Sequence, residues 1–190
     1  MTVIQLFWLI VGASWAVMEM VIAFKTRVNF STTISCEYRS ERFIWLVVAL
    51  ALVVALVFKH LHLVALPIAA GYRQIIAVTL FISGLGIRCA AVVFLGQFFS
   101  TTVVTQNSHR LIETGPYQFI RHPAYTGLLL SFFAAGIAMG DGLALLMLFC
   151  PIAYVISQRI DLEEKWLADH FGTTYDDYCL RTKKLLPWVY

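Results

Sequence analysis

Charged residues are scarce in this sequence of 190 residues. They make up 13% of the chain and hydrophobic residues 60%, whereas soluble domains have about 25% and about 45–50%. The shortage argues against an ordinary soluble domain, and the mean hydropathy of +0.79 indicates an integral membrane protein. Alternating polarity is missing as well. Because the apolar runs are continuous, they predict membrane-spanning helices and argue against a transmembrane barrel.

Motifs of metal, nucleotide and nucleic-acid sites are also missing. The four cysteines are scattered with no CxxC pair, so neither a zinc site nor a disulfide framework is indicated. His60 and His62 flank one leucine at a membrane border, where histidines are more typical of interfacial anchors than of metal ligands. No Gly-rich nucleotide fingerprint is present, and the formal net charge of +3 fits attraction to anionic lipid headgroups. We therefore predict no metal and no nucleic-acid partner.

What the sequence does contain is a series of apolar runs near the length of about 17–25 residues that crosses a bilayer. The expected spans are residues 3–24, 43–58, 72–99 and the two halves of 122–158, which meet at the turn signal Gly140-Asp141-Gly142. A polar connection is expected over 25–42 and an amphipathic, aromatic tail over 162–190. The sequence thus predicts an all-α, polytopic membrane protein of about five transmembrane helices, with a helical hairpin and a C-terminal cytoplasmic amphipathic segment in a single domain.

Basic residues are unevenly distributed between the two sides of these spans. With five spans, most Lys and Arg residues fall on one side, whereas Lys59 and Arg73 fall on the other. Basic residues concentrate on the cytoplasmic side of membrane proteins. We therefore expect an outside N-terminus and a cytoplasmic C-terminus. Arg88 lies well inside the third run, so its side chain is expected to face protein or water.

Polar clusters at the two ends of the hairpin are the candidates for a site. Arg121-His122-Pro123 opens it, and Arg159 and Glu163 close it. A hairpin returns both ends to the same membrane face, so these residues are expected to form one interfacial site. Taken singly, the first cluster fits a basic flank before a helix start, and Arg159 and Glu163 fit an i,i+4 surface ion pair. Their joint occurrence with the motifs below favours a functional site.

Four segments together resemble a known family. These are residues 109–117 (HRLIETGPY), 121–127 (RHPAYTG), Arg159 with Glu163-Glu164, and 171–178 (FGTTYDDY). They are similar to the isoprenylcysteine carboxyl methyltransferases and the related phospholipid methyltransferases. The resemblance covers about residues 101–187, while the N-terminal half matches only as hydrophobic helices. It implies a single membrane methyltransferase domain, with N-terminal transmembrane helices over 1–99 and a cofactor-binding and catalytic half over 100–190.

The resemblance implies S-adenosylmethionine as cofactor, with S-adenosylhomocysteine as product. Carried over position by position, it assigns nine residues to the cofactor pocket. They are His109, Leu111, Ile112, Tyr117, His122, Pro123, Ala124, Tyr125 and Glu163. Arg159 would be the catalytic residue that faces the methyl acceptor. Thr102 stands where the family often has a glutamine near the cofactor.

The acceptor implied by the resemblance is amphiphilic, prenylcysteine-like or a lipid, and is methylated at the cytoplasmic membrane face. An acceptor carboxylate arrives ionised and needs no base, and Arg159 would then orient it. An amine or thiol must lose a proton, which makes His122 or Glu164 the candidate base. A phospholipid amine N-methyltransferase and a small-thiol S-methyltransferase therefore stay open as alternatives. A helical membrane interaction protein without enzymatic activity is the third.

Overall fold

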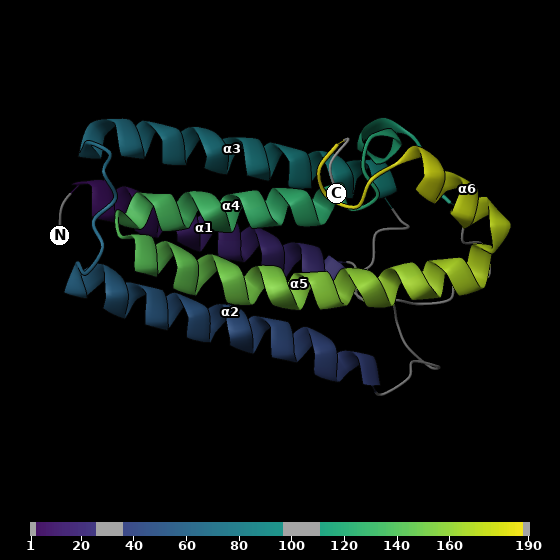
Figure 1. Cartoon of the computed structure of the whole chain (residues 1–190), viewed down its shortest axis with the longest axis horizontal. Helices are drawn as coiled ribbons and strands as arrows, with labels where there is room; N and C mark the ends of the chain where they lie inside the picture. Colours follow the sequence, from purple (N-terminus) through teal and green to yellow (C-terminus); the bar gives the residue numbers. More distant parts are fainter. Residues whose placement is uncertain (1–2, 26–35, 97–110, 188–190) are drawn as a thin grey trace.

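The computed structural model describes residues 3–25, 36–96 and 111–187. Its elements are α1 (Val3–Lys25), α2 (Cys36–Leu61), α3 (Ala70–Leu95), the 3-10 helix η2 (Gly115–Gln118), α4 (Pro123–Met139), α5 (Gly142–Phe171) and α6 (Thr173–Arg181). Helices α1 to α5 run side by side in alternating directions (Figure 1). Within the described ranges, β-structure is limited to two isolated bridges. The prediction of an all-α polytopic protein is confirmed.

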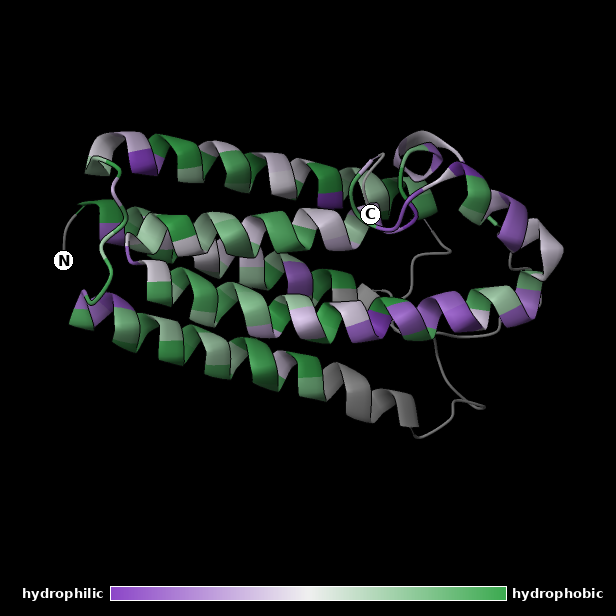
Figure 2. Cartoon of the chain, in the orientation of Figure 1, coloured by the Kyte–Doolittle hydropathy of each residue, from purple (hydrophilic) through white to green (hydrophobic). Residues whose placement is uncertain are grey.

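Four of the helices are long and apolar enough to cross a membrane: α1, α2, α3 and α5. The fifth, α4, is a shorter apolar helix of 17 residues that packs against α3 and α5. Hydrophobic residues dominate helices α1 to α5, whereas hydrophilic residues gather on the C-terminal part of α5 and on α6 (Figure 2). The polar end of the molecule is therefore the end at which α4 begins and α5 leaves the bundle.

Two predicted boundaries are wrong. Residues 36–42 belong to α2 and not to a connection, and α5 continues to Phe171, well past the expected start of the tail at Leu162. Both predictions ended a helix where polar residues begin. A helix that emerges from the bilayer keeps its own backbone hydrogen bonds in water, so polarity marks the membrane border and not the helix end. Residues 97–99 of the third expected span lie outside the described residues.

The predicted turn between the hairpin helices is confirmed. Gly140, at φ +82°, ends α4 in the left-handed conformation that glycine favours. Asp141 caps α5, because its Oδ1 accepts a hydrogen bond from the Ala144 amide at 2.9 Å. Its Oδ2 accepts from the Val64 amide at 2.7 Å, which ties the α2–α3 connection to the hairpin turn. One fully buried carboxylate thus joins both connections at this end of the bundle.

Apolar packing between α2, α4 and α5 forms the main core. Its buried members are Ala51, Ala55, Phe132, Ala144, Leu148, Ile152, Ile156 and Ile160. The last three recur every four residues along α5, so one face of this helix is buried along its length. The last of these core residues, Ile160, is adjacent to Arg159. Packing of the core therefore determines the position of Arg159 along the bundle.

Helices α3 and α4 approach each other closely at two glycines. A Cβ on Gly84 would lie 2.7 Å from the Gly127 carbonyl oxygen, and a Cβ on Gly127 would lie 2.4 Å from the Gly84 oxygen. Real Cβ atoms do not come so near to backbone. Small residues permit such backbone-to-backbone packing of membrane helices. The contact also brings Arg88, one turn after Gly84, against the beginning of α4.

Substituting Gly84 by alanine is expected to destabilise the protein. Its methyl group would collide with the α4 backbone, and overpacking of this kind costs about 1–3 kcal/mol. Gly86 is the matched control, since a Cβ there meets no atom within 4 Å. We expect Gly84→Ala to lower the melting temperature of the detergent-solubilised protein and Gly86→Ala to leave it equal or higher. Equal melting temperatures for the two variants would contradict the packing described here.

Candidate functional site

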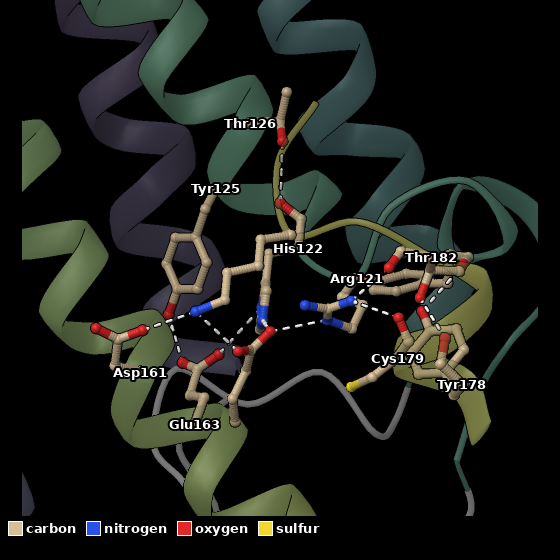
Figure 3. Close-up of polar contacts among 12 residues, drawn as sticks. Arg121, His122, Tyr125, Thr126, Asp161, Glu163, Tyr178, Cys179 and Thr182 are labelled. Carbon is tan, nitrogen blue, oxygen red and sulfur yellow. Dashed lines mark hydrogen bonds and ion pairs between the residues drawn. The ribbon is translucent and has the colours of Figure 1, made fainter. Parts of the chain in front are cut away.

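The site lies where α4 begins beside the polar part of α5, and Figure 3 shows its side chains from both helices and from the C-terminal segment. His122 occupies the N-cap position of α4, and Pro123 follows at the first helical position. Proline suits this position because the amide hydrogen that it lacks would have no hydrogen-bond partner in the first turn of a helix. The His122 side chain makes no capping hydrogen bond. It is therefore available to the site beside α5.

The two adjacent glutamates of α5 have different partners. Glu163 Oε1 accepts a hydrogen bond from the Tyr125 hydroxyl at 2.5 Å and from Arg159 Nε at 3.1 Å. Glu164 instead pairs with Arg121 Nε at 2.8 Å and with Lys184 Nζ at 3.0 Å. Neighbouring residues on a helix point about 100° apart. Glu163 thus joins α5 to α4. Glu164 joins α5 to Arg121, just before α4, and to Lys184, after α6.

His122 lies between these two carboxylates. Its Nδ1 is 3.7 Å from Glu163 Oε2, and its Nε2 is 3.4 Å from Glu164 Oε1. The residue is only 6% exposed, yet Nε2 has no hydrogen-bond partner among the described residues. Buried polar atoms are nearly always hydrogen-bonded. A buried imidazole that lies beside two carboxylates and makes no hydrogen bond through Nε2 is a position at which a polar ligand group would be stabilised.

The segment 182–187 runs back along the start of α4 and fixes it. The amides of Arg121 and His122 donate to the carbonyl oxygens of Lys183 and Lys184, at 2.8 and 3.0 Å. Thr126 Oγ1 donates to the Leu185 oxygen at 2.8 Å. Lys184 also reaches Asp161 at 2.9 Å, and this hydrogen bond raises the pKa of Lys184. The C-terminal segment is therefore a wall of the site.

Tyr117 supports the site from behind. It is buried on η2 against Ala91 and Ala124, and its carbonyl oxygen accepts a hydrogen bond from the Tyr178 hydroxyl at 2.6 Å. Burial raises the pKa of Tyr117 well above its usual range, so the phenol stays neutral. Pro123 is buried as well. These side chains form an apolar cluster next to the polar groups of the site.

The structure brings together four of the predicted site residues: His122, Tyr125, Arg159 and Glu163. The predicted return of the hairpin ends to one face is thus confirmed. Leu111 and Ile112 lie half-buried in the stretch that leads into η2. His109 and Thr102 lie outside the described residues. The assignment of these residues to a cofactor stays a prediction.

Sequence reasoning missed the roles of Arg121 and Lys184. Arg121 donates to Glu164 and, through Nη1, to the Thr182 carbonyl oxygen at 2.5 Å. From the sequence, Arg121 is expected only as part of the polar cluster that opens the hairpin, and Lys184 only as a basic residue on the cytoplasmic side. The sequence does contain one signal for these roles: Asp161 and Glu164 are acidic residues near the membrane border of a continuous helix, where cationic partners are expected. The partners themselves follow only from the path of the C-terminal segment.

A cavity of about 420 Å³ opens beside this network, between α5 and α6. Its walls include Glu164, Ala168, Tyr175 and Cys179. Within the described ranges, no group of three or more His, Cys, Asp and Glu side chains is placed to hold a metal ion. The cavity therefore offers acidic and aromatic surface next to the site.

A family model, the isoprenylcysteine carboxyl methyltransferase (ICMT) family, matches residues 76–169. The protein-S-isoprenylcysteine O-methyltransferase of Schizosaccharomyces pombe is 30% identical over 105 residues, which cover 54% of this chain and 44% of that protein. The enzyme of the same name from Saccharomyces cerevisiae is 27% identical over 140 residues, 73% of this chain and 59% of that protein. The chain thus spans about half the length of these curated relatives.

Two further comparisons bear on the fold and on the acceptor. The solved structure of the eukaryotic intramembrane Ras methyltransferase ICMT superposes with a TM-score of 0.61 at 22% identity, over 90% of this chain and 60% of that one. Similarity at this level of identity is evidence of a shared fold. Methanethiol S-methyltransferase 1 of Bradyrhizobium diazoefficiens is 38% identical over 73 residues, 38% of this chain and 24% of that protein.

Proposed function

We propose that this chain, which belongs to the isoprenylcysteine carboxyl methyltransferase family through residues 76–169, is a methyltransferase that uses S-adenosylmethionine. Its acceptor would be a lipid-linked carboxylate, prenylcysteine-like, held at the membrane surface. The observation that carries the proposal is the convergence of His122, Tyr125, Arg159 and Glu163 at the polar end of an apolar bundle. All four lie inside the segment that the family shares.

The residues at the site suit this cofactor. Glu163 presents a carboxylate for an ammonium group or ribose hydroxyls, and His122 Nε2 is a buried polar atom that makes no hydrogen bond within the described residues, although Glu164 Oε1 lies 3.4 Å away. Tyr117 and Ala124 supply apolar surface for an aromatic base. When bound, S-adenosylmethionine supplies a methyl group activated by its sulfonium. We therefore assign cofactor binding to His109, Leu111, Ile112, Tyr117, His122, Pro123, Ala124, Tyr125 and Glu163.

Arg159 would orient the acceptor. Its side chain is 4% exposed and shares Glu163 Oε1 with Tyr125. A guanidinium is a planar fork of N–H donors that binds carboxylates through two parallel hydrogen bonds, so the side chain type suits a carboxylate acceptor. Placing the acceptor in line behind the methyl group and excluding water are the protein's main tasks. Positioning of this kind lowers barriers by roughly 7–11 kcal/mol.

A small thiol is the second candidate acceptor. The similarity to a methanethiol S-methyltransferase favours it, and so does the position of His122 between two carboxylates, where a released proton would be stabilised. A screen with labelled cofactor separates the candidates. We expect methyl transfer to an S-prenylated N-acetylcysteine and none to methanethiol or phosphatidylethanolamine. Transfer to methanethiol alone would establish the second candidate in place of the first.

Replacing Glu163 by glutamine is expected to weaken cofactor binding more than folding. The change removes a charge that accepts hydrogen bonds, and bonds to charged groups contribute about 1.5–3 kcal/mol, or roughly tenfold to a hundredfold in affinity. Asp169→Asn, at an exposed position of the same helix, is the control. Calorimetry with S-adenosylhomocysteine should give a dissociation constant at least tenfold higher for Glu163→Gln only. An unchanged constant would remove Glu163 from the site.

Replacing Arg159 by lysine should separate the acceptor from the cofactor. A lysine keeps the charge near Glu163 but lacks the planar two-pronged contact with a carboxylate. We expect nearly unchanged affinity for S-adenosylhomocysteine and turnover on the prenylated carboxylate lowered by tenfold or more. Near-normal turnover would reduce Arg159 to the partner of Glu163. Loss of cofactor binding would place it in the cofactor pocket.

We place the site on the cytoplasmic face, because the end of the bundle with α6 carries most of the basic residues. Leu180 on α6 and Leu63 in the α2–α3 connection are both exposed and lie at opposite ends. In a variant without native cysteines, we expect Leu180→Cys to react with an impermeant maleimide only from the cytoplasmic side of sealed vesicles. Leu63→Cys should react only from the other side. Labelling of both from one side would overturn the topology.

A further inference from the structure

A buried ion pair joins α1 to α3 near the site. Arg88 Nε and Nη2 donate to the two carboxylate oxygens of Glu19, and the residues are 6% and 4% exposed. The expectation that Arg88 faces protein is thus confirmed. Charges in the apolar part of a membrane are costly unless paired, and they are typical of functional regions. The pair is two-pronged, so it also fixes the orientation of the guanidinium.

The remaining terminal nitrogen of Arg88 contacts α4. Its Nη1 donates to the carbonyl oxygen of Ala124 at 3.0 Å. This carbonyl belongs to the first turn of α4, between His122 and Tyr125. The contact is possible because Gly84 and Gly127 bring the two backbones together one turn away. Glu19, Arg88 and Ala124 therefore form a continuous polar connection from α1 through α3 to the turn that bears the site residues.

A second connection of the same design lies at the opposite end of α3. Trp8 of α1 donates from Nε1 to Gln74 Oε1 at 2.7 Å, and Gln74 Nε2 donates to the Ala138 carbonyl oxygen in the last turn of α4, at 3.1 Å. Each connection runs from α1 to α3 to a carbonyl of α4. They differ in that only the one through Arg88 ends at the turn of His122 and Tyr125.

We propose that Arg88, held by Glu19, is a positioning residue of the site. It acts through Ala124 by fixing the first turn of α4, so that the Tyr125 hydroxyl meets Glu163 and His122 stays between the two glutamates. The role rests on the proposed function for its effect on the cofactor. It also gives α1 a defined part in the site.

The comparison of Arg88→Met with Gln74→Met tests this role. Each variant breaks one connection, and both are expected to lower the melting temperature. We expect Arg88→Met to raise the dissociation constant for S-adenosylhomocysteine about tenfold or more, and Gln74→Met to leave it within about twofold. A folded Arg88→Met protein with wild-type affinity would overturn the proposal.

A charge exchange separates positioning from the docking of α1. In Glu19→Arg with Arg88→Glu the ion pair is restored, but residue 88 has no donor for the Ala124 oxygen. The melting temperature should recover relative to Arg88→Glu alone, while cofactor affinity stays low. Recovery of affinity would show that only the docking of α1 matters. If Arg88→Met does not fold, Arg88→Lys takes its place, because it keeps a charge beside Glu19 and lacks the fork that reaches Ala124.

Hydrogen exchange tests the same role without any cofactor. We expect the amides of residues 125–128 to exchange at least about fivefold faster in Arg88→Met, or in Arg88→Lys if it takes its place, and to be unchanged in Gln74→Met. Unchanged exchange in the Arg88 variant would overturn the proposal. If the wild-type protein binds no S-adenosylhomocysteine, the proposed function fails, and the exchange rates alone then decide whether Arg88 positions α4.

Discussion

The requirement that buried polar groups be paired governs this fold. A bilayer supplies no water to satisfy them, so each charge inside the apolar bundle needs a partner from another helix. Glu19 and Arg88 meet this requirement between α1 and α3, and Asp141 meets it with backbone amides at the opposite end. Apolar packing alone allows membrane helices to slide and rotate, since lipid is as apolar as the side chains. The polar contacts therefore define the register of the helices.

The same requirement shapes the site. Glu163 and Glu164 are neighbours in sequence but have different partners, and His122 lies between them. The C-terminal segment contributes Lys184 and backbone carbonyls to this arrangement. Residues separated by more than sixty positions thus meet within one network, as Arg121 and Thr182 do. A site of this type depends on the whole polar end of the bundle being folded.

Much of this arrangement follows from the sequence. Continuous apolar runs predict the helices, and Gly140 and Asp141 predict the turn, because both signals are local. The resemblance identifies His122, Tyr125, Arg159 and Glu163 as one group, and the hairpin brings them together. Helix ends at Cys36 and Phe171 could not be predicted from polarity, because a helix continues into water without losing backbone bonds.

Contacts between residues of distant segments could not be predicted from the sequence. Arg88 was expected to face protein, but nothing in its surroundings identified Glu19 or Ala124 as its partners, since these depend on how α1 and α4 pack on α3. Gly84 looks like any other glycine of an apolar helix until its distance to Gly127 is known. Lys184 required the path of the chain after α6. In each case the missing information was tertiary contact and not residue type.

The charges of the site bear on the choice of acceptor. Three cations, Arg121, Arg159 and Lys184, pair with three carboxylates, those of Asp161, Glu163 and Glu164. The charges of these pairs balance, which under the proposed function would favour ligands whose own charges cancel, a sulfonium cofactor with a carboxylate acceptor. A neutral thiol would leave a positive charge uncompensated until its proton departs. Under the proposed function, such an acceptor would need His122 as a base, whereas a carboxylate would need the guanidinium of Arg159. The two candidate acceptors would thus rely on different residues of one network.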